Sequence, residues 1–451
     1  MLIDKRMKVK ERLLLKDEII ELFRSLKVEK EWSFNGYKPS QTGKWTHSYH
    51  RYPAKFIPQL VEKLLDEYIS GNDAHINDPF MGSGTTIVTA ISRGFIASGT
   101  DINGISYLMT KVKSTPIEPT YLQTKINSFN LKLGFLDGAL NFNTNKEIQP
   151  LIPQRHIERI NYWFNEDNKR ELGIILRIIL EEEDKDIRDF LLLAFSHILK
   201  NCSIWLQGST KPTRDFNKKP AKPFTTLKKH LRKMERGNRE FHQVISSEVI
   251  KNIDYYLRIC LGDAKHQQVP SNSVDIIISS SPYVTSYEYA DLHQLSTLWL
   301  DFANDLKEYR SNFIGSAFKK NNVFLKLKSS IAIETIKKMK KNSEKIAREI
   351  ETFFLDIQQV FDESYRILKE GGRCCYVIGN TELKGVKIPN AEIFAEIIQY
   401  SGFKLDRVIK REIPLKILPQ KRDKETGRFA SNHNATSQAY PVEYIVIGKK
   451  E

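Results

Sequence analysis

A glycine-rich turn is the segment whose residue types are best suited to hold a small charged ligand. Residues 78–86 read Asp-Pro-Phe-Met-Gly-Ser-Gly-Thr-Thr, after a predicted strand at 74–78 and before a predicted helix at 85–93. Glycines let the backbone approach a ligand closely, and a helix start offers free N–H groups and a positive dipole end. Alone, such a turn is more often an ordinary helix start, and it lacks the Gly-Lys-Ser/Thr of a P-loop. The neighbouring segments therefore decide what it binds.

Acidic residues that follow two other predicted strands point to the same ligand. Asp101 ends the predicted strand 95–101, about twenty residues after the turn, where an acid binds ribose hydroxyls. Asp263 follows the predicted strand 255–261 and can accept a hydrogen bond from an adenine amino group. Each acid alone could be solvated in a loop. Because parallel sheets bind ligands at the carboxyl ends of their strands, the acids and the turn together favour one shared site.

A second candidate site for chemistry is the serine–proline–tyrosine turn at 279–283, Ser-Ser-Ser-Pro-Tyr, which ends the predicted strand 274–279. This turn can present a hydroxyl, a backbone carbonyl and an aromatic face together. Two acceptors and a stacking ring are what a flipped-out base with an amino group requires. In isolation the same residues could be a plain β-turn with a partly buried tyrosine.

Together these segments resemble the amino-methyltransferases of DNA, which modify adenine or cytosine on the exocyclic nitrogen. Residues 78–86 match that family's cofactor motif at almost every position, and 279–283 resemble its catalytic Ser-Pro-Pro-Tyr. The further matches are the segment 51–58 that precedes the cofactor motif, the ribose motif at 100–103, the adenine motif at 261–264 and a helix–strand unit at 368–380. The resemblance covers about residues 45–112 and 255–451.

The resemblance implies S-adenosylmethionine as the cofactor and a Rossmann-like methyltransferase fold of the α/β class. We expect a mostly parallel sheet of about seven strands with a helical insertion. The implied cofactor-binding residues are Tyr52, Pro53, Ala54, Lys55, Phe56, Asp78, Pro79, Phe80, Gly82, Ser83, Gly84, Thr85, Thr86, Asp101, Ile102, Asp263 and Ala264. The implied catalytic residues are Ser280, Ser281, Pro282 and Tyr283.

The implied reaction is direct methyl transfer to nitrogen. The Ser280 hydroxyl and the backbone carbonyl of Ser281 would accept hydrogen bonds from the target amino group, and Tyr283 would stack on the flipped base. Phe80 would pack near the cofactor sulfonium. Neither a metal nor a covalent enzyme intermediate is expected. The sequence has no Pro-Cys nucleophile, which argues against methylation of cytosine carbon 5.

Two features leave the target base open. Ser281 stands where the family has its first catalytic proline, which affects the geometry of the turn. In the family, serine at the first catalytic position is associated with cytosine and Asp or Asn with adenine. Ser280 therefore favours the 4-amino group of cytosine, with the 6-amino group of adenine as the alternative. An RNA base methyltransferase and a catalytically weak DNA-binding paralogue are further alternatives.

The charge balance predicts a polyanionic partner, for which double-stranded DNA is the first candidate. The 451 residues include 70 Lys+Arg against 55 Asp+Glu, a net charge of +15, although a Lys-rich bacterial proteome would also give an excess. The segment 211–239 is the most basic and begins as a proline-rich loop, so it is either a phosphate-binding surface or a solvated loop. Its predicted DNA-binding residues are Lys211, Arg214, Lys218, Lys219, Lys222, Lys228 and Lys229.

Cysteine usage and hydropathy indicate a cytoplasmic protein. The four cysteines form no Cys-x-x-Cys pair, and His47 with His50 has no further ligand nearby, so neither a disulfide framework nor a metal site is expected. The sequence has no signal-peptide pattern and no apolar run of about 20 residues. A cognate restriction endonuclease is a further partner that the resemblance allows, within a restriction-modification or related defence system.

Periodicity predicts how the chain is organised. Apolar residues at helical spacing over 154–165, 168–182 and 186–201 predict helices, without alternating strands. The expected units are an N-terminal amphipathic arm at 1–36, the cofactor-binding half of the core at 37–112, a helical insertion for target recognition at 113–250, the catalytic motif at 251–300, a Lys-rich insertion at 301–346 and the C-terminal half of the core at 347–451.

Overall fold

The computed structural model describes residues 12–53, 55–139, 148–209, 211–284, 289–316, 325–413, 421–423, 435–438 and 442–451. Ala54, one of the predicted cofactor-binding residues, lies outside the described residues. Within them, none of the helices has the length and apolar content needed to cross a membrane.

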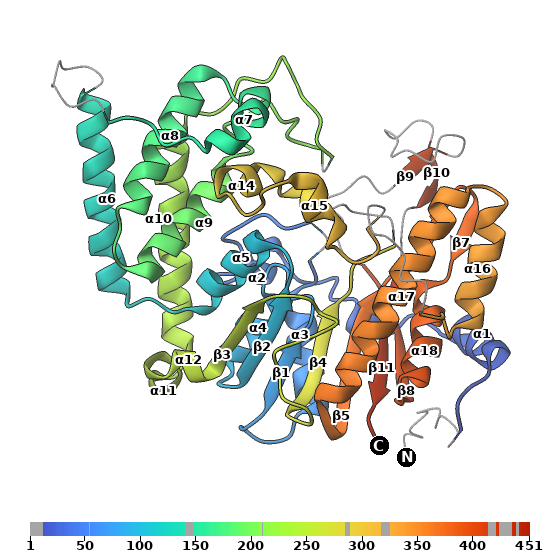
Figure 1. Ribbon diagram of the computed structural model, residues 1–451. Coiled ribbons are helices and arrows are strands. Elements are labelled where there is room, and N and C mark those ends of the chain that lie inside the picture. The colour runs from blue at the N-terminus through green and yellow to red at the C-terminus, as the bar shows by residue number, and fades with distance from the viewer. Residues whose placement is uncertain are drawn as a thin grey trace.

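The centre of the molecule is a seven-stranded sheet with the order β3-β2-β1-β4-β5-β11-β8 (Figure 1). Its strands are β1 His75–Asp78, β2 Ile96–Asp101, β3 Leu257–Leu261, β4 Val274–Ser280, β5 Leu368–Ile378, β8 Lys404–Glu412 and β11 Val442–Lys449. The neighbours from β3 to β5 are parallel, whereas β11 runs antiparallel to both β5 and β8. The expectation of a mostly parallel, Rossmann-like sheet is confirmed.

The sheet is covered on both faces, as its alternating apolar residues require. Ile276 and Ile278 of β4 belong to the core cluster that contains helices α3 and α4, whereas Ile277 belongs to the cluster of α17 and α18. Successive side chains of a strand point to opposite faces, so one apolar strand serves both layers. These helices are α3 Pro58–Tyr68, α4 Thr85–Ser92, α17 Glu344–Ile367 and α18 Asn390–Tyr400.

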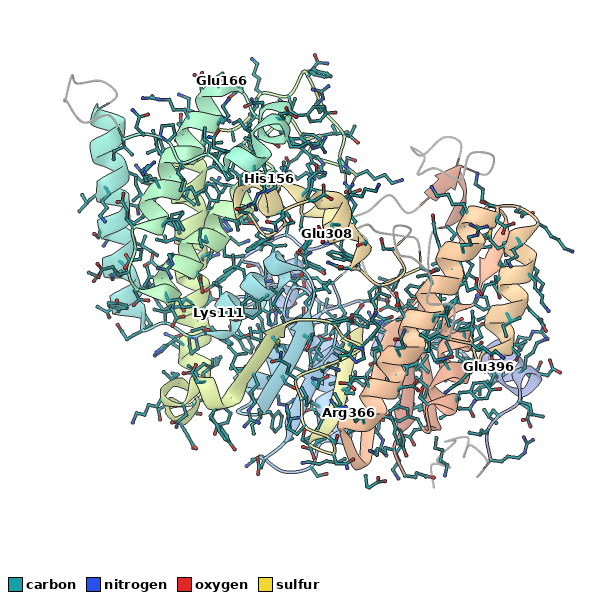
Figure 2. All side chains as sticks on the ribbon, viewed as in Figure 1. Lys111, His156, Glu166, Glu308, Arg366 and Glu396 are labelled. Carbon is teal, nitrogen blue, oxygen red and sulfur yellow. The ribbon has the colours of Figure 1, made fainter. Side chains whose placement is uncertain are left out.

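A helical unit lies beside the β3 edge of the sheet (Figure 1). It consists of α6 Pro119–Ala139, α7 Ile157–Trp163, α8 Glu166–Leu180, α9 Lys185–Ile198 and α10 Pro223–Val244. Its apolar core continues into α5 Gly104–Ser114, which also contacts β2 and β3. Figure 2 shows Lys111 of α5 at this boundary, where its ammonium is paired with Asp186 and Asp189 of α9.

The Lys-rich segment 301–346 contributes to the core layer on the α17 face. Helix α16 Ser330–Lys340 packs against α17 and buries Ile331, Ile336 and Met339, while its lysines stay on the outer side.

The other elements are α1 Lys16–Ser25, α2 Pro39–Thr42, α11 Ser247–Lys251, α12 Ile253–Tyr256, α13 Tyr289–Leu292, α14 Gln294–Trp299, α15 Leu306–Ser311, the 3₁₀ turns Lys30–Trp32 and Gln154–His156, and the short strands β6 Thr381–Leu383, β7 Val386–Ile388, β9 Lys421–Asp423 and β10 Ala435–Gln438.

Candidate active site

A pocket lies at the carboxyl ends of β1, β2 and β4, and most of the predicted cofactor-binding residues line it. The strand order reverses between β1 and β4, and this switch point is where open α/β sheets bind ligands. The predicted residues in its lining are Tyr52, Lys55, Phe56, Asp78, Pro79, Phe80, Gly82, Ser83, Thr85, Asp101, Ile102, Asp263, Ala264, Ser280 and Pro282. Pro53, Gly84, Thr86, Ser281 and Tyr283 belong to the same segments without lining the pocket.

The glycine turn between β1 and α4 has a backbone that requires glycine. Gly82 has φ 47° and Gly84, the residue before α4, has φ 78°. A Cβ on Gly82 would lie 2.9 Å from the Tyr52 hydroxyl, and one on Gly84 would lie 2.9 Å from Thr110 Oγ1. Both glycines are therefore needed for the conformation and for the close approach of neighbouring segments.

A buried lysine supports the same turn from below. Lys113 Nζ donates to the backbone carbonyl of Ser83 at 2.8 Å, and the side chain is almost fully buried. Burial lowers the pKa of Lys113 well below its usual value. Thr110, on the same helix α5, donates from its hydroxyl to the carbonyl of Gly82 at 3.3 Å. Side chains of α5 thus bind two carbonyls of the turn and fix its backbone from behind.

Two buried carboxylates fix the ends of β1 and β2. Asp101 accepts from the amides of Gly82 and Asn103, both at 2.9 Å, and so ties the end of β2 to the glycine turn. Asp78 accepts from Ser279 Oγ at 2.6 Å and from the amide of Phe80 at 3.1 Å. Burial raises the pKa of Asp78 to about 7 and that of Asp101 to about 6.

Asp263, the third predicted acid, lies at the more open end of the pocket. Its side chain is 34% exposed, and it contacts Lys265 Nζ at 3.4 Å. Lys265 also lies 3.3 Å from Asp356 of α17, so the loop after β3 is attached to the α17 layer. An exposed carboxylate beside the pocket fits the outer, heteroaromatic end of a bound nucleoside.

The serine–proline–tyrosine turn at 279–283, predicted to be catalytic, continues directly from β4. Ser280 and Pro282 line the pocket, whereas the hydroxyl of Ser281 is buried without a hydrogen-bond partner in the described part of the chain. The Tyr283 hydroxyl donates to Glu443 Oε2 at 3.2 Å. Ser279 donates to Asp78, so the strand that carries the serine–proline–tyrosine turn is hydrogen-bonded to the strand that carries the glycine turn.

Tyr52, Lys55 and Phe56 line one side of the pocket. Tyr52 stacks on Tyr289, with ring centroids 5.7 Å apart, and lies over the glycine turn. Lys55 Nζ donates to the carbonyl of His47 at 2.8 Å, and burial lowers the pKa of Lys55 to about 8. These residues therefore add aromatic surface and a cation next to the start of α4.

Several lining residues carry no signal in the sequence. Tyr289 and Asn312 to Ile314 line the pocket although they belong to the segments after the catalytic turn. Tyr309 donates to Asn103 Oδ1 at 2.9 Å, across 206 residues of sequence, and accepts from the amide of Gly104 at 3.1 Å. Motifs depend on residues that are close in sequence, so they give no indication of a contact between residues 206 positions apart.

The predicted DNA-binding residues differ in where they point. Lys211, Lys219, Lys222 and Lys229 are exposed. Lys218 Nζ instead donates to the backbone carbonyls of Lys200 and Trp205 at 2.8 and 2.7 Å, and Lys228 is half-buried on α10.

Arg214 lies within an exposed aromatic cluster at the start of the same basic segment. Its guanidinium lies 3.8 Å from the ring centroid of Tyr162 and 4.6 Å from that of Phe216, whose side chain is 75% exposed. Trp163 and Trp205, by contrast, are stacked and fully buried in the helical core. The loop thus presents a mixed basic and aromatic surface to solvent.

The residues of the pocket fit S-adenosylmethionine. The glycine cradle and the start of α4 suit the carboxylate end, Asp101 suits ribose hydroxyls, and Asp263 suits an adenine amino group. Among the residues that the structure describes, no group of three His, Cys, Asp or Glu side chains could hold a metal ion.

Comparison with known proteins gives one family and several relatives. Residues 4–107 match the DNA methylase family. The Type II methyltransferase M.MvaI of Kocuria varians is 28% identical over 433 residues, 91% of this chain and 93% of the relative. M.BsoBI of Geobacillus stearothermophilus is 22% identical over 420 residues, 79% of this chain and 78% of the relative.

Solved structures with some similarity have low TM-scores. A putative DNA modification methylase of Thermus thermophilus, complexed with S-adenosyl-L-methionine, has a TM-score of 0.21 and 17% identity, covering 42% of this chain and 53% of that chain. A TehB-like methyltransferase of Corynebacterium glutamicum has a TM-score of 0.28 and 8% sequence identity, and the match covers 87% of each chain. The family match over residues 4–107 and the similarity to these relatives confirm the resemblance to the amino-methyltransferases of DNA that the motifs predict.

Proposed function

We propose that the protein transfers a methyl group from S-adenosylmethionine to the 4-amino group of a flipped-out cytosine in double-stranded DNA. The observation that carries this proposal is the shared pocket that the glycine turn, Asp101 and Ser280 line together. A cofactor site and two candidate acceptors for an amino group thus lie at adjacent strand ends. The names of the relatives, all Type II methyltransferases, support DNA as the substrate.

The cofactor supplies an electrophilic methyl group when it is bound. The chain's own residues hold and orient it: the start of α4 and Lys55 at the carboxylate end, Asp101 at the ribose and Asp263 at the adenine. Phe80 also lines the pocket, where its ring can face a sulfonium charge. This arrangement positions the donor before any base enters the site.

The catalytic turn acts on the base by hydrogen bonding and orientation. The lone pair of an exocyclic amino nitrogen is delocalised into the ring, so the nitrogen is a weak nucleophile. Acceptance of its protons by Ser280 Oγ and the Ser281 carbonyl would localise that pair, and fixed acceptors require no reorganisation during transfer. Tyr283 provides the stacking surface for the base.

Cytosine is favoured over adenine because Ser280, and not Asp or Asn, stands at the first catalytic position. This preference comes from the resemblance to the family, in which serine at that position is associated with cytosine and Asp or Asn with adenine. Adenine is the alternative, and sequencing of the modified DNA separates it from cytosine.

DNA is proposed to lie along the exposed side of the loop between α9 and α10. This loop carries Lys211, Lys219 and Lys222 together with the Arg214–Phe216 cluster. Helix α7, which carries Tyr162, is hydrogen-bonded to α14 through Arg159 and Gln294 at 2.9 Å. Helix α14 follows the pocket residue Tyr289 after a few residues. The basic surface is therefore connected to the pocket through α7 and α14.

The decisive experiment is expression in a host without DNA methylation, followed by single-molecule sequencing of its DNA. We expect 4-methylcytosine within one short recognition sequence, and the Ser280→Ala protein serves as the blank. Modified adenine would overturn the choice of base. Unmodified DNA from a protein that still binds S-adenosylmethionine would support a weak paralogue, and labelled methyl transfer to RNA alone would support the RNA enzyme. A neighbouring restriction endonuclease that the modification blocks would place the protein in a restriction-modification system.

A further inference from the structure

Tyr283 of the catalytic turn is held by a residue far away in the sequence. Its hydroxyl donates to Glu443 Oε2 at 3.2 Å, across 160 residues. The ring of the same tyrosine packs on the backbone after β5, where a Cβ on Gly379 would lie 3.4 Å from Tyr283 Cε2 and Oη. The phenol is therefore fixed at its hydroxyl end by a carboxylate and along its edge by a glycine.

The carboxylate that holds Tyr283 is itself part of a cross-strand ion pair. Glu443 of β11 is directly opposite Arg411 of β8, and Arg411 Nε lies 3.3 Å from Glu443 Oε1. The two side chains are only 3% and 9% exposed. Figure 1 shows β11 between β5 and β8, so the pair sits beside the strand end that carries Gly379.

Stability alone does not account for this buried pair. Arg411 Nε and Nη1 make no hydrogen bond within the described residues, so the 3.3 Å contact is an ion pair without hydrogen-bond geometry. Desolvating two charges for a contact of that quality adds little to stability, and apolar residues of similar volume often serve a sheet as well. What the pair does supply is an acceptor of fixed position for the Tyr283 hydroxyl.

We propose that Glu443 is a positioning residue, which holds the Tyr283 ring in the orientation that stacks on the flipped base, with Arg411 balancing its charge. The inference rests on the proposed function, because it assigns the ring to base stacking. Burial and the nearby Glu443 raise the pKa of Tyr283 well above its usual value, so the phenol stays a donor at neutral pH. Loss of the acceptor removes the hydrogen bond that fixes the hydroxyl end of the ring, so the ring can tilt and misplace the base relative to the methyl donor.

The test compares two double variants that both lack the buried charges. Arg411→Gln with Glu443→Gln keeps an acceptor for Tyr283, whereas Arg411→Gln with Glu443→Met removes it. We expect the first to keep turnover within about threefold of wild type and the second to lose about tenfold in kcat, with S-adenosylmethionine affinity unchanged in both. Glu412→Ala, an exposed glutamate next to Arg411, is the control and keeps full turnover.

Tyr283→Phe identifies the group through which Glu443 acts. This variant keeps the ring, so it should fold, and it should lose about as much turnover as the Met-containing double variant. Combined with Tyr283→Phe, the two double variants should become equal, because the interaction they differ in is gone. Equal turnover of the two double variants, or wild-type turnover of Tyr283→Phe, would overturn the proposal.

A base-flipping signal separates this inference from the proposed function. DNA with 2-aminopurine at the target position gains fluorescence on flipping and loses part of it when an aromatic ring stacks on the base. We expect brighter complexes for Tyr283→Phe and for the Met-containing variant than for wild type. A wild-type protein that flips the base without methylating it would count against the proposed function alone, and identical fluorescence in all variants would count against the inference alone.

Discussion

The cofactor half and the substrate half of the pocket are built in different ways. The cofactor half comes from neighbouring segments: Asp101 accepts from Gly82, 19 residues earlier, and Lys113 donates to Ser83, 30 residues earlier. The substrate half joins Ser279 to Asp78 across 201 residues and Tyr283 to Glu443 across 160. Contacts between residues close in sequence hold the glycine turn of the first half, whereas contacts between distant strands hold the turn of the second.

The contrast between the halves indicates which changes should affect only one of them. The contacts that hold the glycine turn come from Asp101 and from Thr110 and Lys113 of α5, and not from residues 280–283, so the cofactor half should survive substitutions at 280–283. The hydrogen bond from Ser279 to Asp78 is a direct connection between the halves, as is the one from Thr86 Oγ1 to the carbonyl of Ile278 at 3.0 Å, and both orient β4 relative to the glycine turn. Mutations on either side of these connections can therefore show whether the halves are separable.

Ser280→Ala should have the largest effect and should act on the substrate half alone. Removal of one positioned acceptor is expected to lower kcat by about 10²–10³-fold, in line with the loss of a single preorganised hydrogen bond at a reacting centre. Calorimetry should show unchanged affinity for S-adenosylmethionine. Ser273→Ala, next to the start of the same strand, is the matched control, and wild-type turnover in Ser280→Ala would contradict the assignment.

Asp101→Asn should act on the cofactor half, with a rise of about tenfold in the dissociation constant of S-adenosylmethionine at pH 7.5. Because burial raises the pKa of Asp101 to about 6, its carboxyl becomes neutral as the pH falls through that value. The protonated form is a poorer acceptor for ribose hydroxyls, so wild-type affinity should fall between pH 7 and pH 5.5. The difference between the wild-type and Asn profiles isolates Asp101, because Asp78, with a pKa of about 7, titrates in both proteins. If affinity for S-adenosylmethionine had the same pH dependence in both proteins, Asp101 would not be a ribose-binding residue.

Two glycines with the same backbone angle test whether close packing shapes the cofactor half. Gly84 and Gly94 both have φ 78°, but a Cβ on Gly84 would meet Thr110 Oγ1 at 2.9 Å and one on Gly94 would meet nothing within 4 Å. Gly84→Ala should cost about 1–3 kcal/mol more in unfolding free energy than Gly94→Ala and should weaken cofactor binding. Equal losses in urea titrations would show that backbone strain alone matters.

The smallest effect is expected on the salt dependence of DNA binding. Neutralising the exposed Lys219 and Lys229 to Gln should lower the slope of log affinity against log salt by about 0.9 for each phosphate that the protein no longer neutralises. Lys218→Met should leave the slope unchanged and lower stability, since its ammonium binds backbone carbonyls inside the loop. Filter binding between about 50 and 200 mM salt, a range in which such slopes are measured, would report the slopes of both variants. An unaltered slope in the Lys219/Lys229 variant would indicate that these lysines contact no phosphates and that the segment is solvated.

The local parts of this architecture could be predicted from the sequence, and the long-range parts could not. The strand–turn–helix unit around Gly82 and Gly84, and helices α7 to α9, follow from glycine placement and apolar spacing within a few turns of chain. The position of Tyr289 in the pocket depends on packing between segments that share no local pattern. The density of lysines predicted a basic surface, but it could not predict which lysines are exposed. The ammonium of Lys218 binds a backbone carbonyl, and the Lys-rich helix α16 buries an apolar face.

Strand β11 lies between β5 and β8, although both of those strands precede it in the chain. During synthesis on the ribosome, therefore, β5 and β8 must wait with unpaired edges until 442–449 emerges, and the parallel part of the sheet can form earlier. The nascent protein would then be able to bind its cofactor before Glu443 arrives to hold Tyr283. If Tyr283 and Glu443 act as proposed, the ability to methylate would be acquired later in synthesis than the ability to bind the methyl donor.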